Sequence, residues 1–242
     1  MTLKPAHDPS CVLAYPFEEA SDNTVYDQSQ YGRNGTISGA TRVQGKLGKG
    51  MYFDGVDDYV RSSAFTLTGT AISIMAWVNC QIQSSFQMVF NKSTQSPTQG
   101  FLMLYREFNT DKLCYQYATG STYVAKDAVN FFTGFNNQYL FVAVTCDYQN
   151  KILKFYRNGQ IHTTYSITDP MLFPSASSAC YICSYQGSMH FFKGVIDEVR
   201  LYNRLLTDQE ILKHYRYGIS QRARIRLPMF ERVKRRQARQ VT

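Results

Sequence analysis

The sequence lacks any long hydrophobic run. No stretch approaches the roughly 18 consecutive apolar residues that a membrane-spanning helix needs, so we expect no membrane span. The amino-terminal stretch MTLKPAHDPSCVLAYPF also has no apolar segment of signal-peptide length before the strand-like CVLAYPF begins. Export by a cleaved signal is therefore not expected. We predict a place in the cytoplasm, or in a virion or contractile assembly that reaches the outside without a signal.

Cysteine is too sparse for a disulfide framework in a chain of this length. The six cysteines are Cys11, Cys80, Cys114, Cys146, Cys180 and Cys183. Without a signal peptide, most of them are expected to be buried small hydrophobic residues. CYIC at 180–183 resembles half a zinc site, but positions i and i+3 of a strand point to opposite faces, and no second Cys or His pair lies at metal-ligand spacing. We therefore expect no zinc site.

Net charge is low in the body of the chain and high only at its end. Of the net +8, residues 219–242 supply +7, because they hold eight basic residues and one acid, Glu231; residues 1–218 carry only +1. A partner attracted by charge is therefore expected at the tail alone. We divide the chain into a lead-in (1–10), a main domain (11–217) and an Arg-rich arm (218–242).

The Arg-rich arm also contains a small apolar island around Pro228. Two interpretations stay open: a disordered solubilising tail, or an arm that docks on another protein subunit or on nucleic acid. The island favours docking, because purely solvated tails rarely carry Leu-Pro-Met-Phe. Nucleic-acid contact would be non-specific, since no base-reading motif is present. The residues that we predict to anchor a partner are Arg222, Arg224, Arg226, Leu227, Phe230, Arg232, Lys234, Arg235, Arg236 and Arg239.

Short strand-like segments recur every 10–15 residues and are separated by turns. This spacing is typical of an all-β sandwich, and the 14% aromatic content suits pleated strands better than helices. The clearest hairpin is FYRNGQIHTT, because Asn158-Gly159 supplies the two positive-φ positions of a type I′ turn. QSQYGRNGTISG and NKSTQSPTQG are predicted to be loops from their composition.

The hydrophobic period changes within GVIDEVRLYNRLLTDQEILKHY, residues 194–215. Val195, Asp197 and Val199 alternate with their neighbours, which predicts a strand that places these three side chains on one face. Thr207 and Glu210 then form a Thr-x-x-Glu capping box, which predicts the start of a helix. We expect a closing strand followed by one short helix with an apolar stripe, packed on the body.

Five segments occur in the order expected of the LamG-like, concanavalin A-type jelly-roll domains: LAYPFEEASDNTVYDQSQYGRNGTI, GKLGKGMYFDGVDDYV, ISIMAWVN, YLFVAVTCDYQNKILKFYRNGQ and GVIDEVRLYNRLLTDQEI. The chain resembles this family over about residues 11–215. The resemblance implies two antiparallel sheets of about six or seven strands each, with the last strand beside the first. Tyr139-Leu140-Phe141 stands where family members usually show a Trp and a His, a departure that we interpret as divergence.

The resemblance also extends to glycosidases of this fold, which carry their catalytic carboxyl groups on a strand with the pattern Glu-x-Asp-x-x-Glu. None of the six Glu residues of this chain lies in such a pattern. Asp197 and Glu198 are adjacent in a strand, so they are expected to face opposite sides and not to act as a pair. The four His residues lie in no motif such as Gly-x-Ser-x-Gly. We predict that the protein is not an enzyme.

The acidic stretch FDGVDDYV has two interpretations. Asp54, Asp57 and Asp58 can form a tight turn in which their side chains accept hydrogen bonds from local N–H groups. Alternatively, carboxylate and carbonyl oxygens near this stretch can bind Ca²⁺. The family resemblance implies a structural Ca²⁺ between an early strand and the last one. The ligands that it implies here are Glu18, the carbonyl of Gly55, and Asp197.

Glycan binding is the common non-catalytic activity that the resemblance implies. Polar and aromatic loop residues that could contact a sugar are Tyr31, Asn34, Gln95, Gln99, Asn136 and Asn137, but the sequence selects no binding face. We therefore predict a non-catalytic module that is a structural or adhesion component of a larger assembly, such as a phage virion, anchored by its basic arm. The alternatives are a free glycan-binding module or nucleic-acid contact through the tail.

Overall fold

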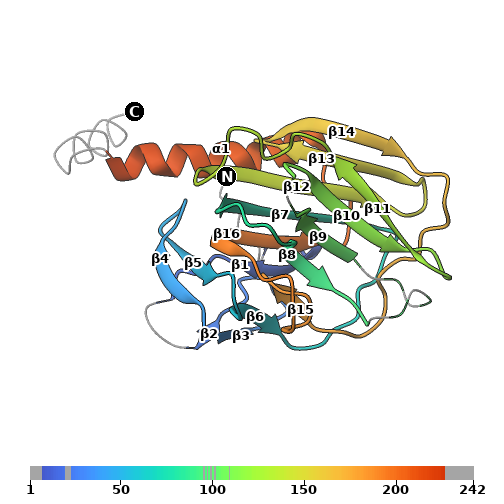
Figure 1. Ribbon diagram of the computed structural model, residues 1–242, viewed down its shortest axis with the longest axis horizontal. Coiled ribbons are helices and arrows are strands. Elements are labelled where there is room, and N and C mark those ends of the chain that lie inside the picture. Colours follow the sequence, from blue (N-terminus) through green and yellow to red (C-terminus); the bar gives the residue numbers. More distant parts are fainter. Residues whose placement is uncertain are drawn as a thin grey trace.

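The computed structural model is a two-sheet antiparallel β-sandwich with one long helix on its outside (Figure 1). The structure describes residues 7–226 except 20–22, 95, 97, 99, 101 and 109, and it describes no side chains for residues 221–226. The predicted all-β jelly-roll architecture is confirmed. Each sheet has eight strands, slightly more than the family resemblance implied.

The first sheet has the order β14-β13-β12-β7-β16-β5-β4, and β1 also pairs with β16. Because β1 and β16 are antiparallel neighbours, the last strand lies beside the first, as predicted. The bounds of its strands are β1 Cys11–Tyr15, β4 Thr41–Gln44, β5 Lys49–Asp54, β7 Ala71–Cys80, β12 Tyr139–Asp147, β13 Ile152–Arg157, β14 Gln160–Ser166 and β16 Lys193–Tyr202.

The second sheet has the order β11-β10-β9-β8-β15-β6-β3-β2. Its strand β3 lies within the stretch QSQYGRNGTISG that composition predicted to be a loop, because pairing with β6 overrides its Gly- and Asn-rich local preference. The bounds of its strands are β2 Thr24–Val25, β3 Gly35–Ser38, β6 Tyr59–Ser62, β8 Gln87–Lys92, β9 Leu102–Arg106, β10 Leu113–Ala118, β11 Tyr123–Ala128 and β15 Cys180–Ile182.

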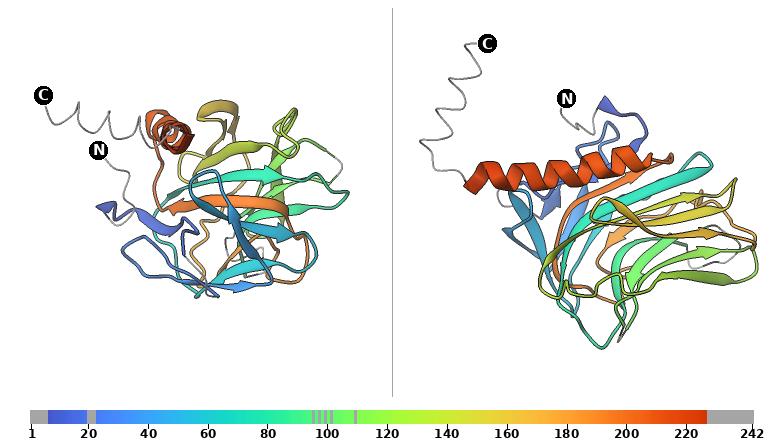
Figure 2. Two further views of the ribbon diagram at one scale, coloured as in Figure 1. Left: turned by 90° about the vertical axis from the view of Figure 1, so that its left-hand side faces the viewer. Right: turned by 90° about the horizontal axis from the view of Figure 1, so that it is seen from above.

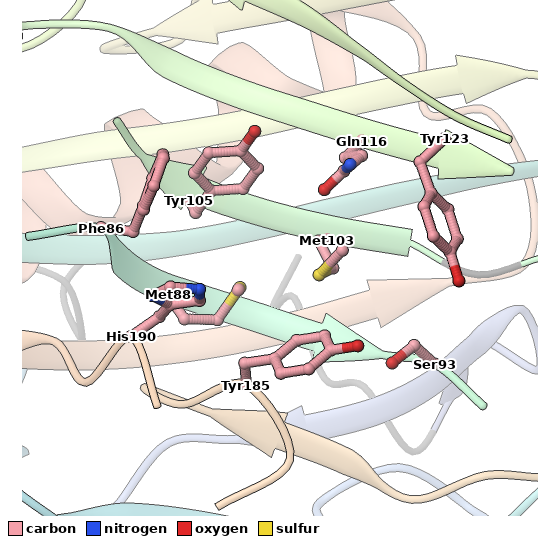
Figure 3. A pocket seen from close by; sticks show the side chains of 9 residues that line it. All are labelled: Phe86, Met88, Ser93, Met103, Tyr105, Gln116, Tyr123, Tyr185 and His190. Carbon is pink, nitrogen blue, oxygen red and sulfur yellow. The ribbon is translucent and has the colours of Figure 1, made fainter. Parts of the chain in front are cut away.

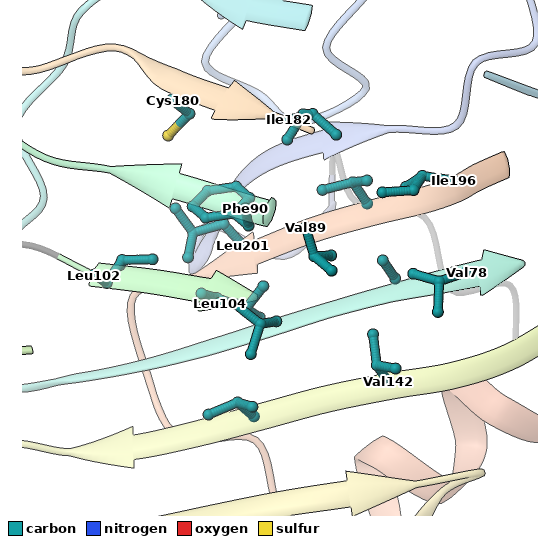
Figure 4. Packing of buried hydrophobic residues seen from close by; sticks show 14 of the residues in the cluster. Val78, Val89, Phe90, Leu102, Leu104, Val142, Cys180, Ile182, Ile196 and Leu201 are labelled. Atoms are coloured by element: carbon teal, nitrogen blue, oxygen red, sulfur yellow. The ribbon is translucent and has the colours of Figure 1, made fainter. Parts of the chain in front are cut away.

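The main core fills the space between the two sheets (Figure 4). Alternate residues of β7, including Ile74 and Val78, face this core, whereas Met75 and Trp77 face a second cluster on the outer side of the first sheet. Strand β7 is therefore buried on both faces, which explains its nearly continuous apolar sequence. The six cysteines are free and buried, as predicted.

Two of these cysteines differ in orientation from the sequence-based expectation. Cys180 and Cys183 both belong to the main core instead of pointing to opposite faces. The reason is that β15 ends at Ile182, and Cys183 has a positive φ of 74°, which breaks the alternation of an extended strand.

Strand β16 contains a β-bulge that the sequence did not reveal. Its register with β7 shifts between Asp197 and Arg200, and Glu198 has a φ of 53°. The extra residue reverses the alternation, so Ile196 and Val199 both face the core. The prediction that Val195, Asp197 and Val199 share one face is therefore wrong. The bulge leaves Asp197 completely buried.

Helix α1, Asp208–Arg226, begins at the predicted capping box. The backbone N–H of Glu210 donates to Thr207 Oγ1 at 3.2 Å, and the N–H of Thr207 donates to Glu210 Oε2 at 2.8 Å. Helix α1 is the predicted C-terminal helix, is 19 residues long, and continues through residues 217–218, where the arm was expected to begin. It lies on the outer face of the first sheet, and its last turns extend past the strands (Figure 2).

Over the residues described, no helix has both the length and the apolar character needed to cross a bilayer.

Candidate ligand-binding site

A cavity of about 320 Å³ lies on the second sheet. Strand alternation places its floor on the outer face of that sheet, because Leu102 and Leu104 of β9 face the core and Met103 faces the opposite way. The nine described residues that line the cavity are Phe86, Met88, Ser93, Met103, Tyr105, Gln116, Tyr123, Tyr185 and His190 (Figure 3).

The register of three neighbouring strands assembles most of the cavity. Met88 of β8 lies opposite Tyr105 of β9, and Met103 of β9 lies opposite Gln116 of β10. Residues directly opposite each other in an antiparallel pair share a face, so two cross-strand rows form the floor and one wall. Tyr123 enters from β11 at the far end.

The opposite wall comes from the loop between β15 and β16. Tyr185 and Met189 form an isolated β-bridge, and the N–H of Met88 donates to the carbonyl of His190 at 2.8 Å. The His190 ring lies 5.1 Å from Phe86 and 6.2 Å from Tyr185, measured between ring centroids. Phe86 in turn contacts the Tyr105 ring at 5.6 Å. Aromatic contacts therefore join the loop to the sheet.

None of the nine described lining residues is an acid, a lysine or an arginine. Burial lowers the pKa of His190 below its usual 6.5, so its imidazole is neutral at pH 7. Aromatic faces and thioethers provide an apolar surface, while the Gln116 amide and the tyrosine hydroxyls provide hydrogen-bonding groups. The cavity is therefore suited to bind an uncharged ligand with both an apolar face and polar groups.

An ionic cluster lies next to this cavity on the same sheet. Glu107, Cys114 and Asp127 bring potential ligand atoms within 4.8 Å of one another. Lys112 Nζ lies 3.0 Å from Glu107 Oε2 and 3.2 Å from Asp127 Oδ2, so this lysine pairs with both carboxylates and offsets one of their two negative charges.

The three calcium ligands implied by the family resemblance do not come together. Asp197 Oδ2 accepts a hydrogen bond from the N–H of Leu47 at 2.8 Å, and the Glu18 carboxylate accepts from the N–H of Lys49 at 3.3 Å, so both lie on the turn that precedes β5. Gly55 follows the opposite end of β5. Lys49 and Gly55 are six residues apart along this extended strand, so about 20 Å separates the two places, at roughly 3.3 Å per residue.

Glu18 and Asp197 nevertheless have features that fit a cation. Asp197 is completely buried, and its Oδ1 has no hydrogen-bond partner among the described residues. Burial, followed by repulsion from neighbouring carboxylates, raises the pKa of both side chains. A Cβ atom on Gly45 would lie 2.7 Å from Asp197 Oδ2, so this glycine leaves space beside the carboxylate.

The acidic stretch FDGVDDYV forms the tight turn that was one of its two interpretations. Asp58 Oδ2 accepts from the N–H of Asp54 at 2.8 Å, and Asp54 Oδ1 accepts from the N–H of Val56 at 2.8 Å. The carboxylates of Asp54, Asp57 and Asp58 lie within 4.8 Å of one another. Backbone N–H groups of the turn therefore donate hydrogen bonds to two of these three carboxylates, those of Asp54 and Asp58.

The described loop residues considered for sugar contact, Tyr31, Asn34, Asn136 and Asn137, do not line the cavity. Tyr31 donates to the carbonyl of Pro9 at 2.8 Å, and the Asn34 and Asn136 side chains accept from backbone N–H groups, so all three support loops. Gln95 and Gln99 lie outside the described residues. The sequence signal for the cavity was the outward-facing set in FQMVFNK and FLMLYR, but alternation alone does not indicate which outer face is hollow.

The predicted anchoring residues fall into two groups. The backbones of Arg222, Arg224 and Arg226 belong to α1. The others lie outside the described residues: Leu227, Phe230, Arg232, Lys234, Arg235, Arg236 and Arg239.

The fold is a jelly-roll sandwich with a cavity on one outer sheet face. A laminin G-like family model, described as the concanavalin A-like lectin/glucanases superfamily, matches residues 54–212. The chain therefore belongs to this superfamily. The comparison with curated protein sequences gives no match.

Solved structures similar to this chain include toxin receptor-binding domains. The botulinum neurotoxin serotype G binding domain has a TM-score of 0.66 at 11% identity, over 85% of this chain and 50% of that one. The binding domain of Paraclostridial Mosquitocidal Protein 1 has a TM-score of 0.65 at 12% identity, over 85% and 52%.

A third similar structure contains a sugar. The botulinum neurotoxin serotype D ligand-binding domain, solved in complex with N-acetylneuraminic acid, has a TM-score of 0.63 at 13% identity, over 86% of this chain and 50% of that one. The present chain spans about half the length of these structures. At such identities the likeness shows a shared fold.

Proposed function

We propose that this protein is a non-catalytic glycan-binding module, and that the cavity on the second sheet is its sugar site. The observation that supports this most directly is the convergence of four aromatic side chains on one cavity: Phe86, Tyr105, Tyr123 and Tyr185. Sugar rings have an apolar C–H face that packs on aromatic rings, and their hydroxyls hydrogen-bond to amides and tyrosines. Membership in the concanavalin A-like lectin/glucanases superfamily, whose name includes carbohydrate-binding lectins, is consistent with this proposal.

The absence of a carboxylate from the described lining supports a binding role over hydrolysis. Glycoside hydrolysis usually needs two carboxyl groups on either side of the scissile bond, and none of the nine described lining residues is an acid. The adjacent Glu107 and Asp127 are both paired with Lys112, so neither is positioned as a free acid or base.

Substituting Tyr105 by alanine tests this proposal, because the Tyr105 ring lines the cavity and also contacts the Phe86 ring. On an array of immobilised glycans, we expect the natural chain to bind a subset and Tyr105→Ala to lose that binding. Truncating one stacking ring costs about 1–3 kcal/mol, or roughly 5- to 150-fold in affinity. Tyr26→Ala is the matched control, since Tyr26 is 45% exposed and does not line the cavity. Equal binding by both variants would place the sugar elsewhere.

We also propose a structural Ca²⁺ held by Glu18 and Asp197 without Gly55. The buried, unpartnered Oδ1 of Asp197 supports this proposal, because Ca²⁺ binds carboxylate oxygens and a buried oxygen without a partner is unfavourable. Bound Ca²⁺ would join the turn before β5 to the last strand. Removing it with a chelator should lower the melting temperature. An unchanged melting temperature, with Ca²⁺ added or removed, would refute the metal site.

A role in a larger assembly, through the Arg-rich arm, stays a prediction. The direction of α1 supports it, because the last turns of the helix, which include Arg222, Arg224 and Arg226, extend away from the strands (Figure 1). A free glycan-binding protein and non-specific nucleic-acid contact remain the alternatives.

A further inference from the structure

We propose that Ser93 and Asn91 form a hydrogen-bonding pair at one end of the cavity that selects an uncharged sugar by one of its hydroxyls, and that Gln186 positions this pair. This inference rests on the proposed glycan-binding function. It deepens that function by naming the ligand class and the residues that set specificity.

Strand β8 places both residues of the pair on the cavity side of the sheet. Asn91 lies directly opposite Met103, which forms part of the floor, and directly opposite Tyr181 on the other neighbouring strand. Ser93 follows two residues later, so it faces the same side, and it lines the cavity.

Two neighbouring amides determine the orientation of the Ser93 hydroxyl. Its Oγ accepts a hydrogen bond from Gln186 Nε2 at 2.9 Å and another from Asn91 Nδ2 at 3.3 Å. A serine hydroxyl has two acceptor sites and one hydrogen to donate. Because both acceptor sites are occupied, the hydrogen is left for a third group, and the cavity is the space beside it.

The Asn91 side chain supplies the complementary acceptor. Asn91 is completely buried, and its Oδ1 has no hydrogen-bond partner among the described residues. Buried polar atoms are nearly always paired in folded proteins, and Asn91 donates to Ser93, which lines the cavity, so we take the unpaired Oδ1 as the acceptor for a group that arrives with the ligand. Together, Ser93 donates and Asn91 accepts. A sugar hydroxyl, which does both, matches this pair.

Gln186 holds the pair from the loop between β15 and β16. Its Nε2 also donates to the Ser93 carbonyl at 3.0 Å, so Gln186 forms hydrogen bonds with both the backbone and the side chain of Ser93. Gln186 and Gly187 have positive φ angles of 53° and 74°, and a Cβ on Gly187 would approach the Tyr59 ring to 3.1 Å. Because Gln186 acts through Ser93, it is a positioning residue.

The charge of the site restricts the ligand further. A sialic acid carboxylate or a sugar sulfate would enter a largely apolar cavity in which none of the nine described lining residues is a cation at pH 7. Burying an anion without a partner is strongly unfavourable. The cavity should therefore bind lactose-type neutral sugars more tightly than the same sugars carrying an acidic group.

The experiment measures affinities of the full chain for a panel of neutral oligosaccharides, including lactose and N-acetyllactosamine, and for their sialylated and sulfated counterparts. Variants are Ser93→Ala, Gln186→Met and the control Ser63→Ala, an exposed serine that does not line the cavity. We expect neutral sugars to be preferred, Ser93→Ala to weaken their binding about 10-fold, and Gln186→Met to weaken it less. Ser63→Ala should have no effect.

Monodeoxy analogues of the tightest neutral sugar separate direct contact from a loss of folding. For one analogue, Ser93→Ala should cause no further loss, because the contacted hydroxyl is already missing. Additive losses for every analogue, or unchanged affinity in Ser93→Ala while Tyr105→Ala loses binding, would overturn this inference and leave the proposed function intact. Tighter binding of the acidic sugars would overturn the charge argument. Binding of no glycan would overturn the proposed function, and this inference with it.

Discussion

Replacing Gly218 with alanine tests whether helix α1 is held against the sandwich by its contact with Trp77. A Cβ atom at position 218 would lie 2.6 Å from both Cζ2 and Nε1 of the indole. The Tyr215 ring is stacked on the same indole, with centroids 5.6 Å apart, and the Phe141 ring lies 5.3 Å away. Trp77 is only 2% exposed, so the indole has little room to move.

Two effects of opposite sign decide the outcome of Gly218→Ala. Alanine favours the helix over glycine by about 1 kcal/mol. Overpacking a filled interior costs about 1–3 kcal/mol. If the helix is docked as described, the clash exceeds the gain, and we expect a net loss of up to about 2 kcal/mol. If the helix were undocked, only the gain would remain, and the variant would be more stable by about 1 kcal/mol.

Urea unfolding measures the difference in the free energy of unfolding between Gly218→Ala and the natural chain. Trp77 is the only tryptophan in the chain, so intrinsic fluorescence reports on the contact itself. Ser220→Ala is the control, because Ser220 is exposed on the same helix and its substitution adds helix propensity without a clash. A Gly218→Ala chain that is more stable than the natural chain by about 1 kcal/mol would refute the docking of α1 through Trp77.

Two further predictions concern the helix and the arm. Hydrogen bonds, first from Arg204 and then from Thr207, lower the pKa of Glu210 to about 2 from its usual 4.5. The resulting stability is complete above pH 4.5 and is lost as the pH falls toward 2, so Glu210→Gln should flatten the acid side of a plot of melting temperature against pH; an unchanged acid side would contradict this. Deleting residues 227–242 should leave the melting temperature unchanged and abolish assembly. If assembly persists and only DNA retention is lost, the arm does not anchor a protein partner.

Much of the fold could be predicted from the sequence because local chemistry specified it. Asn158 and Gly159 have φ angles of 52° and 79°, as the predicted type I′ turn requires. The capping box at Thr207 starts α1 where it was expected. These features depend on residues close together in the chain, so their physical causes are visible in the sequence itself.

The bulge in β16 and the position of Gly55 depended on contacts between distant segments. Neither β-propensity nor alternation indicates that Glu198 adopts a positive φ, yet this single residue changes the face on which Val199 lies. The family resemblance implied that Gly55 is a calcium ligand together with Glu18 and Asp197. In the structure, Gly55 lies at the opposite end of β5 from these two carboxylates. Pairing between strands that are far apart in the chain decided both outcomes.

By itself the sequence determined the sandwich class, the turn and cap positions, and the concentration of positive charge at the end of the chain, because each follows from local composition and spacing. Only the tertiary structure decided where a ligand can bind. The cavity unites β8, β9, β10 and β11 with the loop before β16, and the orientation of the Ser93 hydroxyl depends on Gln186, 93 residues later. Strand register and loop closure bring these groups together, and neither can be read from one segment alone.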